Sequence, residues 1–208
     1  VDTTNPEAYE FYLKAKHKYE KRENTDDTEI ARGLLKKAIE LDGNLIFAKT
    51  LLGMTYREMG DYDEAMEIYT SVLKQAEELG DKRGMGISLI SIGTVHAYKG
   101  VYDKALDYYG RSLAIKEEIG DKRGMGYSLL NIGAVHHNKG DYAKALDYFG
   151  RSLTIQEELG DKRGMGYSLG NIGLVHSSKG DYEKAEEYLE KSLTIQKKIG
   201  LKDKELET

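Results

Sequence analysis

Cysteine and proline are the residue types this sequence lacks, with no cysteine and a single proline, Pro6, in 208 residues. Without cysteine the chain forms no disulfide and no thiolate zinc site, and it carries no cysteine nucleophile. A chain so poor in proline is also unlike the loop-rich β folds. Because a reducing compartment suits such a chain, we expect a cytoplasmic location.

Long apolar runs and an excess of positive charge are missing too. No apolar run approaches the roughly 18 residues of a membrane-spanning helix, and the opening "VDTTNPEAYE" has no signal-peptide region. The net charge of −5 argues against nucleic acid as a partner, since phosphate binding relies on a basic excess. We therefore expect neither membrane nor nucleic-acid binding. Because the sequence begins with Val1 instead of methionine, we expect a trimmed N-terminus or a segment of a longer protein.

What the sequence does contain is a repeat. The stretch "GDKRGMG" occurs at 80–86, 120–126 and 160–166, always 40 residues apart, and residues 81–120 match residues 121–160 at 28 of 40 positions. A period of this size indicates stacked supersecondary units, none of which buries its apolar face alone. With 39% hydrophobic residues the chain is too apolar for disorder, and helix is the favoured class.

Each repeat is predicted to be a pair of helices. In the unit 121–160, apolar or small residues recur at helical spacing over 125–136 and again over 142–153. Gly-Asp pairs join the helices within units and between units, because glycine ends a helix in the left-handed conformation and aspartate caps the next helix. Val101 replaces aspartate at one joint, so we expect Val101→Asp to add roughly 1 kcal/mol of stability there.

These units resemble the tetratricopeptide repeat (TPR). The stretch "LLNIGAVHHNKGDYAKALDYF" carries the family's signature, in the residues Ile132-Gly133, Gly140-Asp141-Tyr142, Ala145 and Phe149. The resemblance covers about residues 45–200 and implies an all-α helical-hairpin solenoid, a right-handed superhelix of about five helix pairs.

The repeats also depart from the usual TPR pattern. They are longer than the usual 34 residues, His136 stands where an aromatic residue is usual, and no proline closes the unit. Repeats of this longer kind are similar to those of Pins-type spindle-orientation adaptors, to kinesin light chains, and to TPR segments of many bacterial regulatory proteins.

The whole chain, 1–208, is expected to form a single array. It comprises a divergent N-terminal helix pair at 6–44, repeats at 45–80, 81–120, 121–160 and 161–200, and a truncated or partial capping segment at 201–208. In the N-terminal pair we predict helices over 6–22 and 28–41, separated by the loop "ENTDD". The final "GLKDKELET" looks like the start of a further first helix.

The "GDKRGMG" stretch has glycines and basic residues, as phosphate-binding loops do. Its lysine comes too early for such a loop, however, and no β-strand leads into it. We predict that its basic residues form weak ion pairs with glutamates just before each joint, such as Glu117 and Glu118. The alternative is a basic rim that binds an acidic peptide or phosphate, made of Lys82, Arg83, Lys122, Arg123, Lys162 and Arg163.

His96, His136 and His176 also recur every 40 residues. Units stacked about 10 Å apart cannot share a zinc ion whose ligands bind at about 2 Å, so we interpret these residues as partly buried, hydrogen-bonded core histidines. Catalytic motifs are missing as well. We therefore expect no enzyme activity, no metal and no cofactor.

The inner face of the first helices, which lines the concave surface of a TPR superhelix, is left for function. We predict a peptide-binding groove at Phe47, Leu51, Met54, Ile87, Ser91, Thr94, Tyr127, Leu130, Asn131, His137, Tyr167, Asn171 and Leu174. The resemblance to Pins-type repeats implies that Asn131 and Asn171 contact the backbone of an extended peptide, since an amide both donates and accepts. TPRs that grip chaperone tails use lysines at such positions, and this groove has none.

The function expected from these features is a non-catalytic scaffold. It would bind a peptide or a partner segment in the concave groove and belong to a larger signalling or regulatory protein. The alternative is self-association through the repeat ends, because near-identical units could stack end to end into a structural array.

Overall fold

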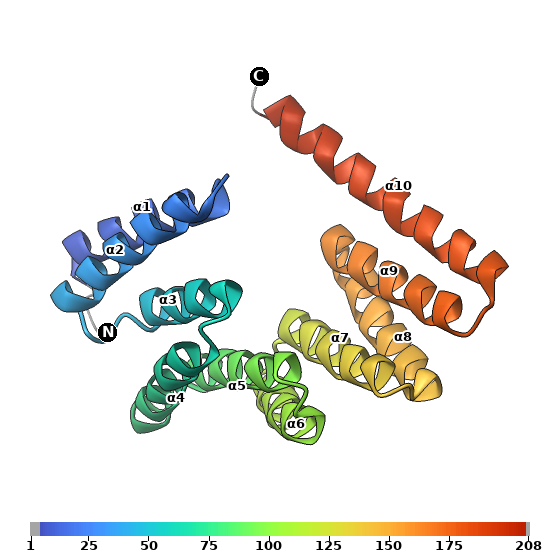
Figure 1. Ribbon diagram of the computed structural model, residues 1–208, viewed down its shortest axis with the longest axis horizontal. Helices are drawn as coiled ribbons and strands as arrows, with labels where there is room; N and C mark the ends of the chain where they lie inside the picture. Colours follow the sequence, from blue (N-terminus) through green and yellow to red (C-terminus); the bar gives the residue numbers. More distant parts are fainter. Residues whose placement is uncertain (1–4, 207–208) are drawn as a thin grey trace. The chain divides into compact units, whose positions relative to one another are not determined.

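The computed structural model describes residues 5–206, with side chains described up to residue 200, and its regular elements in that range are ten α-helices (Figure 1). The predicted all-α class and the five helix pairs are confirmed. The chain divides into two compact units, one ending at Val95 and the other beginning at His96, within α5.

The first unit contains α1 (Pro6–Glu20), α2 (Thr25–Leu41), α3 (Ile46–Met59), α4 (Tyr62–Leu79) and most of α5 (Lys82–Tyr98). The Asn5 side chain caps α1 by accepting from the Glu7 and Ala8 N–H groups. Helix α2 begins three residues earlier than predicted, because the Asn24 side chain accepts from the Asp27 N–H at 3.0 Å and so places most of the "ENTDD" loop in the helix.

The second unit contains the end of α5, then α6 (Tyr102–Glu118), α7 (Lys122–Asn138), α8 (Tyr142–Leu159), α9 (Lys162–Ser178) and α10 (Tyr182–Leu206). Helix α10 continues through Gly200, so residues 201–206 extend it and do not start a new helix as predicted; 207–208 lie outside the described residues. Gly200 does not adopt the positive φ that ends the helices at the other joint glycines, and Leu201 offers no side chain that could cap a new helix.

Apart from Gly200, the glycine at each joint from Gly60 to Gly180 adopts the predicted left-handed conformation, with φ between 63° and 86°. The aspartates behave less uniformly. Between repeats, Asp81, Asp121 and Asp161 accept from the N–H three residues ahead at 3.0, 2.9 and 3.1 Å. Within repeats, Asp61 makes no capping bond and Asp141 makes only a 3.5 Å contact. The predicted cap is therefore absent at Asp61 and weak at Asp141.

Each repeat closes around a glycine of its first helix. Phe149 on α8 is fully buried, and a Cβ added to Gly133 on α7 would lie only 2.7 Å from the ring. The lack of a side chain at this position is what lets the two helices approach closely. Tyr69 and Leu189 pack in the same way against Gly53 and Gly173.

A buried polar network joins three consecutive helices of the second unit. The Ser152 hydroxyl donates to the Gly126 carbonyl at 2.8 Å, linking α8 to α7. The Gln156 amide donates to Ser152 at 2.9 Å and accepts from the Ser168 hydroxyl at 2.6 Å, which links α8 to α9. Because these side chains satisfy one another, they are buried without the penalty of an unpaired polar group.

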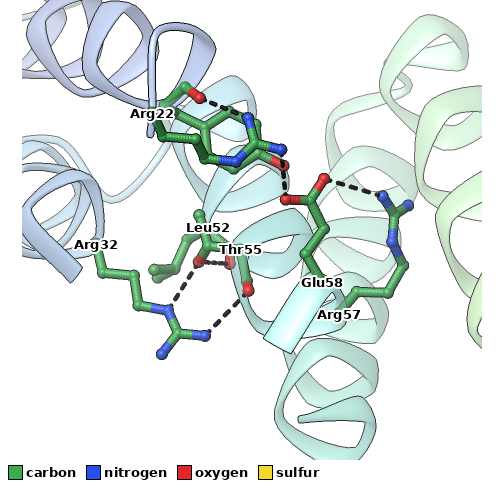
Figure 2. Close-up of polar contacts among 7 residues, drawn as sticks. Arg22, Arg32, Leu52, Thr55, Arg57 and Glu58 are labelled. Atoms are coloured by element: carbon green, nitrogen blue, oxygen red, sulfur yellow. Dashed lines mark hydrogen bonds and ion pairs between the residues drawn. The ribbon is translucent and has the colours of Figure 1, made fainter. Parts of the chain in front are cut away.

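In the first unit the buried Arg32 links α2 to α3. Its guanidinium donates to the Thr55 hydroxyl at 3.1 Å and to the Thr55 carbonyl at 3.0 Å (Figure 2), and it stacks on the Tyr56 ring at 4.1 Å. Arg22 at the end of α1 reaches Glu58 near the end of α3 at 2.8 Å. Arginine thus connects the divergent N-terminal helix pair to the first regular repeat at two points.

Candidate functional site

In the second unit, one face of the first helices α7 and α9 carries the predicted tyrosines and asparagines. Tyr167 and Asn171 lie one turn apart on α9, as Tyr127 and Asn131 do on α7. Tyr167 is 51% exposed and Leu174, nearly two turns further along α9, is 49% exposed. Burial, followed by the charge of Asp161, raises the pKa of the Tyr127 phenol, so this side chain stays uncharged on the face.

The two asparagine side chains are both half-buried and differ in their contacts. The Asn171 amide nitrogen donates to the Tyr167 carbonyl at 2.9 Å, which leaves its carbonyl oxygen as the group that can accept from a ligand. Asn131 makes no hydrogen bond to any residue in the described range, so both its donor and its acceptor are available. This face can therefore pair with backbone N–H and C=O groups.

His137 connects the predicted face of α7 to the end of α9. Its Nε2 lies 2.9 Å from the Ser178 hydroxyl, and that hydroxyl donates to the Leu174 carbonyl at 3.0 Å. Since a serine has one hydroxyl proton, His137 must be the donor to Ser178. In the neutral ring this leaves Nδ1 as an acceptor. Ser178 was missed from the sequence because its partner is 41 residues away.

The predicted groove residues of the first unit are more apolar. Phe47 is 53% exposed, and Met54, Ile87 and Thr94 are half-buried. Thr94 bonds its own helix, donating to the Ile90 carbonyl at 2.8 Å.

Three of the predicted groove residues, Leu51, Ser91 and Leu130, are buried. Leu130 packs in a core cluster with Ile172 and Val175 of α9. These three side chains therefore hold helices together and offer little surface to a ligand. The spacing within one repeat could not reveal this burial, because Leu130 is covered by α9 and Leu51 packs with core residues of α1 and α2.

The basic residues that follow the joint before α7 pair with acidic residues at and just beyond the far end of their own repeat. Lys122 contacts Glu158 at 2.9 Å and Arg123 contacts Asp161 at 3.3 Å, so the predicted pairing with Glu117 and Glu118 is wrong for this repeat. The antiparallel packing of α7 and α8 brings Glu158, at the end of the same repeat's second helix, beside Lys122, and Asp161 follows in the next joint. Of the proposed rim, Lys122 and Arg123 are therefore already neutralised.

A surface pocket of about 390 Å³ lies beside Arg163 and Tyr167 of α9 and is closed by Gln196, Ile199 and Gly200 of α10. Arg163 makes no ion pair within the described residues, unlike its counterpart Arg123. Gln196 and Ile199 were not predicted because only first helices were considered for the groove. The pocket places a cationic group and an aromatic ring at one end of the α9 face.

The three repeated histidines stack on tyrosines of the next helix, with ring centroids 5.4, 5.4 and 5.6 Å apart, in the pairs His96–Tyr108, His136–Tyr148 and His176–Tyr188. They are partly buried as predicted, but none of the three Nδ1 atoms makes a hydrogen bond to a described residue. No group of three His, Asp or Glu side chains in the described part of the chain could hold a metal ion.

The charged side chains near the repeated histidines differ between repeats, and this difference affects the histidine pKa. Burial lowers the pKa of His136 below 6.5, while the Asp141 carboxylate, 3.6 Å from Nδ1, opposes this shift. Burial also lowers the pKa of His96, and there Lys104 and Lys99 reinforce the shift. The joint residue Val101 supplies no carboxylate. The histidine pKa is thus set in part by the residue that begins the second helix.

We expect Val101→Asp to raise the pKa of His96 and to stabilise the fold by less than about 1 kcal/mol, since within-repeat aspartates cap poorly. A lowered pKa means that the unfolded state binds more protons near pH 6.5. The free energy of unfolding that depends on neutral His96 is therefore fully present above pH 6.5 and is lost as the pH falls through the folded-state pKa. Val101→Asp should lose less of this stability at low pH than the original chain.

Proton NMR titration of the ring measures the pKa, and Val101→Asn is the uncharged control. An equal shift in Val101→Asn would contradict the role of charge.

Among the described residues, no helix combines the length and apolarity that crossing a bilayer requires.

The repeat period, the left-handed glycine joints and the paired helices are matched by a known family. The tetratricopeptide repeat model matches residues 46–118 and 125–198. The chain belongs to the tetratricopeptide repeat family. The resemblance predicted from the sequence is thereby confirmed, and the helix pairs α3/α4 to α9/α10 are its TPR units. No curated protein matches the chain in sequence.

Solved TPR structures share the fold at low identity. A Rap protein complexed with competence and sporulation factor is 17% identical, with a TM-score of 0.80, over 93% of this chain and 54% of that one. A signal transduction ATPase with numerous domains and a TPR sensor, from Pyrococcus horikoshii, is 23% identical, with a TM-score of 0.76, over 94% of this chain and 31% of that one. BtubC from P. vanneervenii is 18% identical, with a TM-score of 0.68, over 93% and 89%. The chain thus spans about half of the Rap protein and a third of the ATPase, and these likenesses show the fold alone.

Proposed function

We propose that this TPR chain is a non-catalytic scaffold that binds an extended peptide or partner segment along the first-helix face of α7 and α9. The observation that carries the proposal is the pairing of exposed apolar side chains with uncommitted amides on one face. Tyr167 and Leu174 are about half exposed, while Asn131 and the carbonyl oxygen of Asn171 have no partner among the described residues.

The chemistry of this face favours a main-chain ligand over a small charged molecule. Asparagine amides can pair with the N–H and C=O of any peptide bond, so they hold a backbone irrespective of its sequence. The tyrosines supply broad, rigid contact area at little cost in side-chain entropy. Arg163 at the pocket end of α9 adds one cationic contact, so we expect the peptide to carry an acidic group there.

The comparisons are consistent with this proposal. The Rap protein is found in complex with another factor, and the P. horikoshii ATPase uses its TPR segment as a sensor. A TPR array that recognises a partner would suit a place within a larger signalling or regulatory protein.

The proposal can be tested without knowing the natural ligand. Peptides selected from a random displayed library against the chain are labelled, and their affinities are measured by fluorescence anisotropy. We expect Asn131→Ala combined with Asn171→Ala to weaken binding about tenfold or more, because the peptide backbone groups lose their partners.

Asn138→Ala is the matched control, because Asn138 is an exposed asparagine at the end of α7, outside the predicted face. It should leave the affinity unchanged. Selected peptides that bind the double variant as tightly as the original chain would overturn the assignment of this face, though not the fold.

A further inference from the structure

Helix α10 carries an exposed apolar stripe. Tyr182, Leu189 and Leu193 are 72%, 39% and 48% exposed. Their spacings of seven and four residues place them on one side of the helix. Figure 1 shows α10 continuing beyond the start of α9, its neighbour within the unit. The stripe thus spans about three turns along one side of α10.

The equivalent stripe on α8 is covered. Phe149 and Leu153 stand at the positions of Leu189 and Leu193, and they are fully buried and half-buried respectively. Phe149 lies in a cluster with residues of α9, the helix that follows. An established interface of this protein therefore consists of another helix laid against this stripe.

The charges of α10 indicate which helix fits. Four of the five charged residues from 183 to 190 are glutamates, whereas the charged residues from 191 to 198 are all lysines. Glu190 and Lys197 are seven residues apart, so both lie on the same edge of the stripe, on either side of Leu193. Both are exposed, and neither makes an ion pair with a described residue.

We propose that α10 docks against α10 of a second copy of this chain, antiparallel, about a two-fold axis beside Leu193. In this arrangement Glu190 of each copy meets Lys197 of its partner, so two pairs of opposite charge flank the axis. A parallel arrangement would place like charges together. The contact is isologous, so it closes at a dimer instead of growing into an end-to-end stack.

Sedimentation velocity over a wide range of concentration tests the association. We expect a monomer–dimer equilibrium that Leu193→Glu abolishes, while Leu13→Glu, at a 46% exposed leucine of α1, leaves it unchanged. A monomer at every concentration would overturn the proposal. So would a polymer that grows with concentration, because an isologous contact cannot produce one.

Charge reversal tests the antiparallel register. Glu190→Lys and Lys197→Glu should each weaken dimerisation about tenfold, since two attractive pairs become two repulsive ones. The double variant should restore it. If the double variant did not regain the dimer affinity that each single variant loses, the antiparallel register would be refuted.

The absence of cysteine permits a direct geometric test as well. Leu193→Cys should form a disulfide-linked dimer under mild oxidation, because the proposed axis brings the two side chains together. Leu13→Cys should form it far more slowly. Equal rates for the two variants would place the axis elsewhere and contradict the proposal.

Discussion

Replacing Phe149 by alanine is expected to lower the free energy of unfolding by about 3 to 5 kcal/mol. The side chain is fully buried, and its ring lies against Gly133, where the backbone of α7 comes closest to α8. The substitution removes the transfer free energy of the ring and leaves a cavity. Two helices held at a fixed joint by Gly140 cannot easily collapse into that cavity.

Chemical denaturation followed by far-UV circular dichroism measures this loss. Phe47→Ala is the matched control, because Phe47 is 53% exposed and the same atoms are removed from a side chain largely in water. We expect it to change stability by no more than about 0.5 kcal/mol. If the two substitutions were equally destabilising, burial against Gly133 would not be the cause.

Arg32→Ala is expected to cost about 2 to 3 kcal/mol, the second largest effect. Arg32 is 7% exposed, and its removal breaks two hydrogen bonds to Thr55 (Figure 2) and the stacking on Tyr56. The loss stays below that of a fully buried ion pair, because the carboxylates left behind, Glu29 and Asp61, are 58% and 44% exposed and water can solvate them.

Arg32→Lys separates charge from geometry in this prediction. Lysine keeps the positive charge near Glu29 and Asp61 but lacks the planar fork that reaches both oxygens of Thr55 and stacks on Tyr56. We expect Arg32→Lys to recover less than half of the stability that Arg32→Ala loses, measured by the same denaturation. A full recovery would show that charge alone holds α2 to α3.

Helix pairs and joints were predictable because their causes are local. The apolar stripes and the glycine that ends each helix are signals within a few residues, and the period of 40 residues repeats them along the chain. The aspartate caps were predicted best between repeats. Within repeats, Asp61 pairs instead with Arg32, 29 residues away, at 3.3 Å, and Asp141 pairs with the Lys144 side chain at 2.9 Å beside a weak cap.

The candidate site was predicted in part, for a related reason. The exposed positions Phe47, Tyr167 and Leu174 lie where the repeat pattern places them. Leu130 lies on the same helices but is buried, because the neighbouring first helix covers it. The hydrogen bond from His137 to Ser178 also depends on how α7 and α9 pack, and no spacing within one repeat indicates it.

The sequence by itself determined that this protein is built of helix pairs and that a glycine ends the helix at each regular joint, since hydrogen bonding and backbone conformation within one unit decide these properties. The tertiary structure alone decided which equivalent positions are exposed. Arg123 and Phe149 are paired or buried, whereas their counterparts Arg163 and Leu189 are not. Equivalent positions in successive repeats differ because the solvent exposure of a side chain depends on what packs against it, and the next repeat supplies that neighbour.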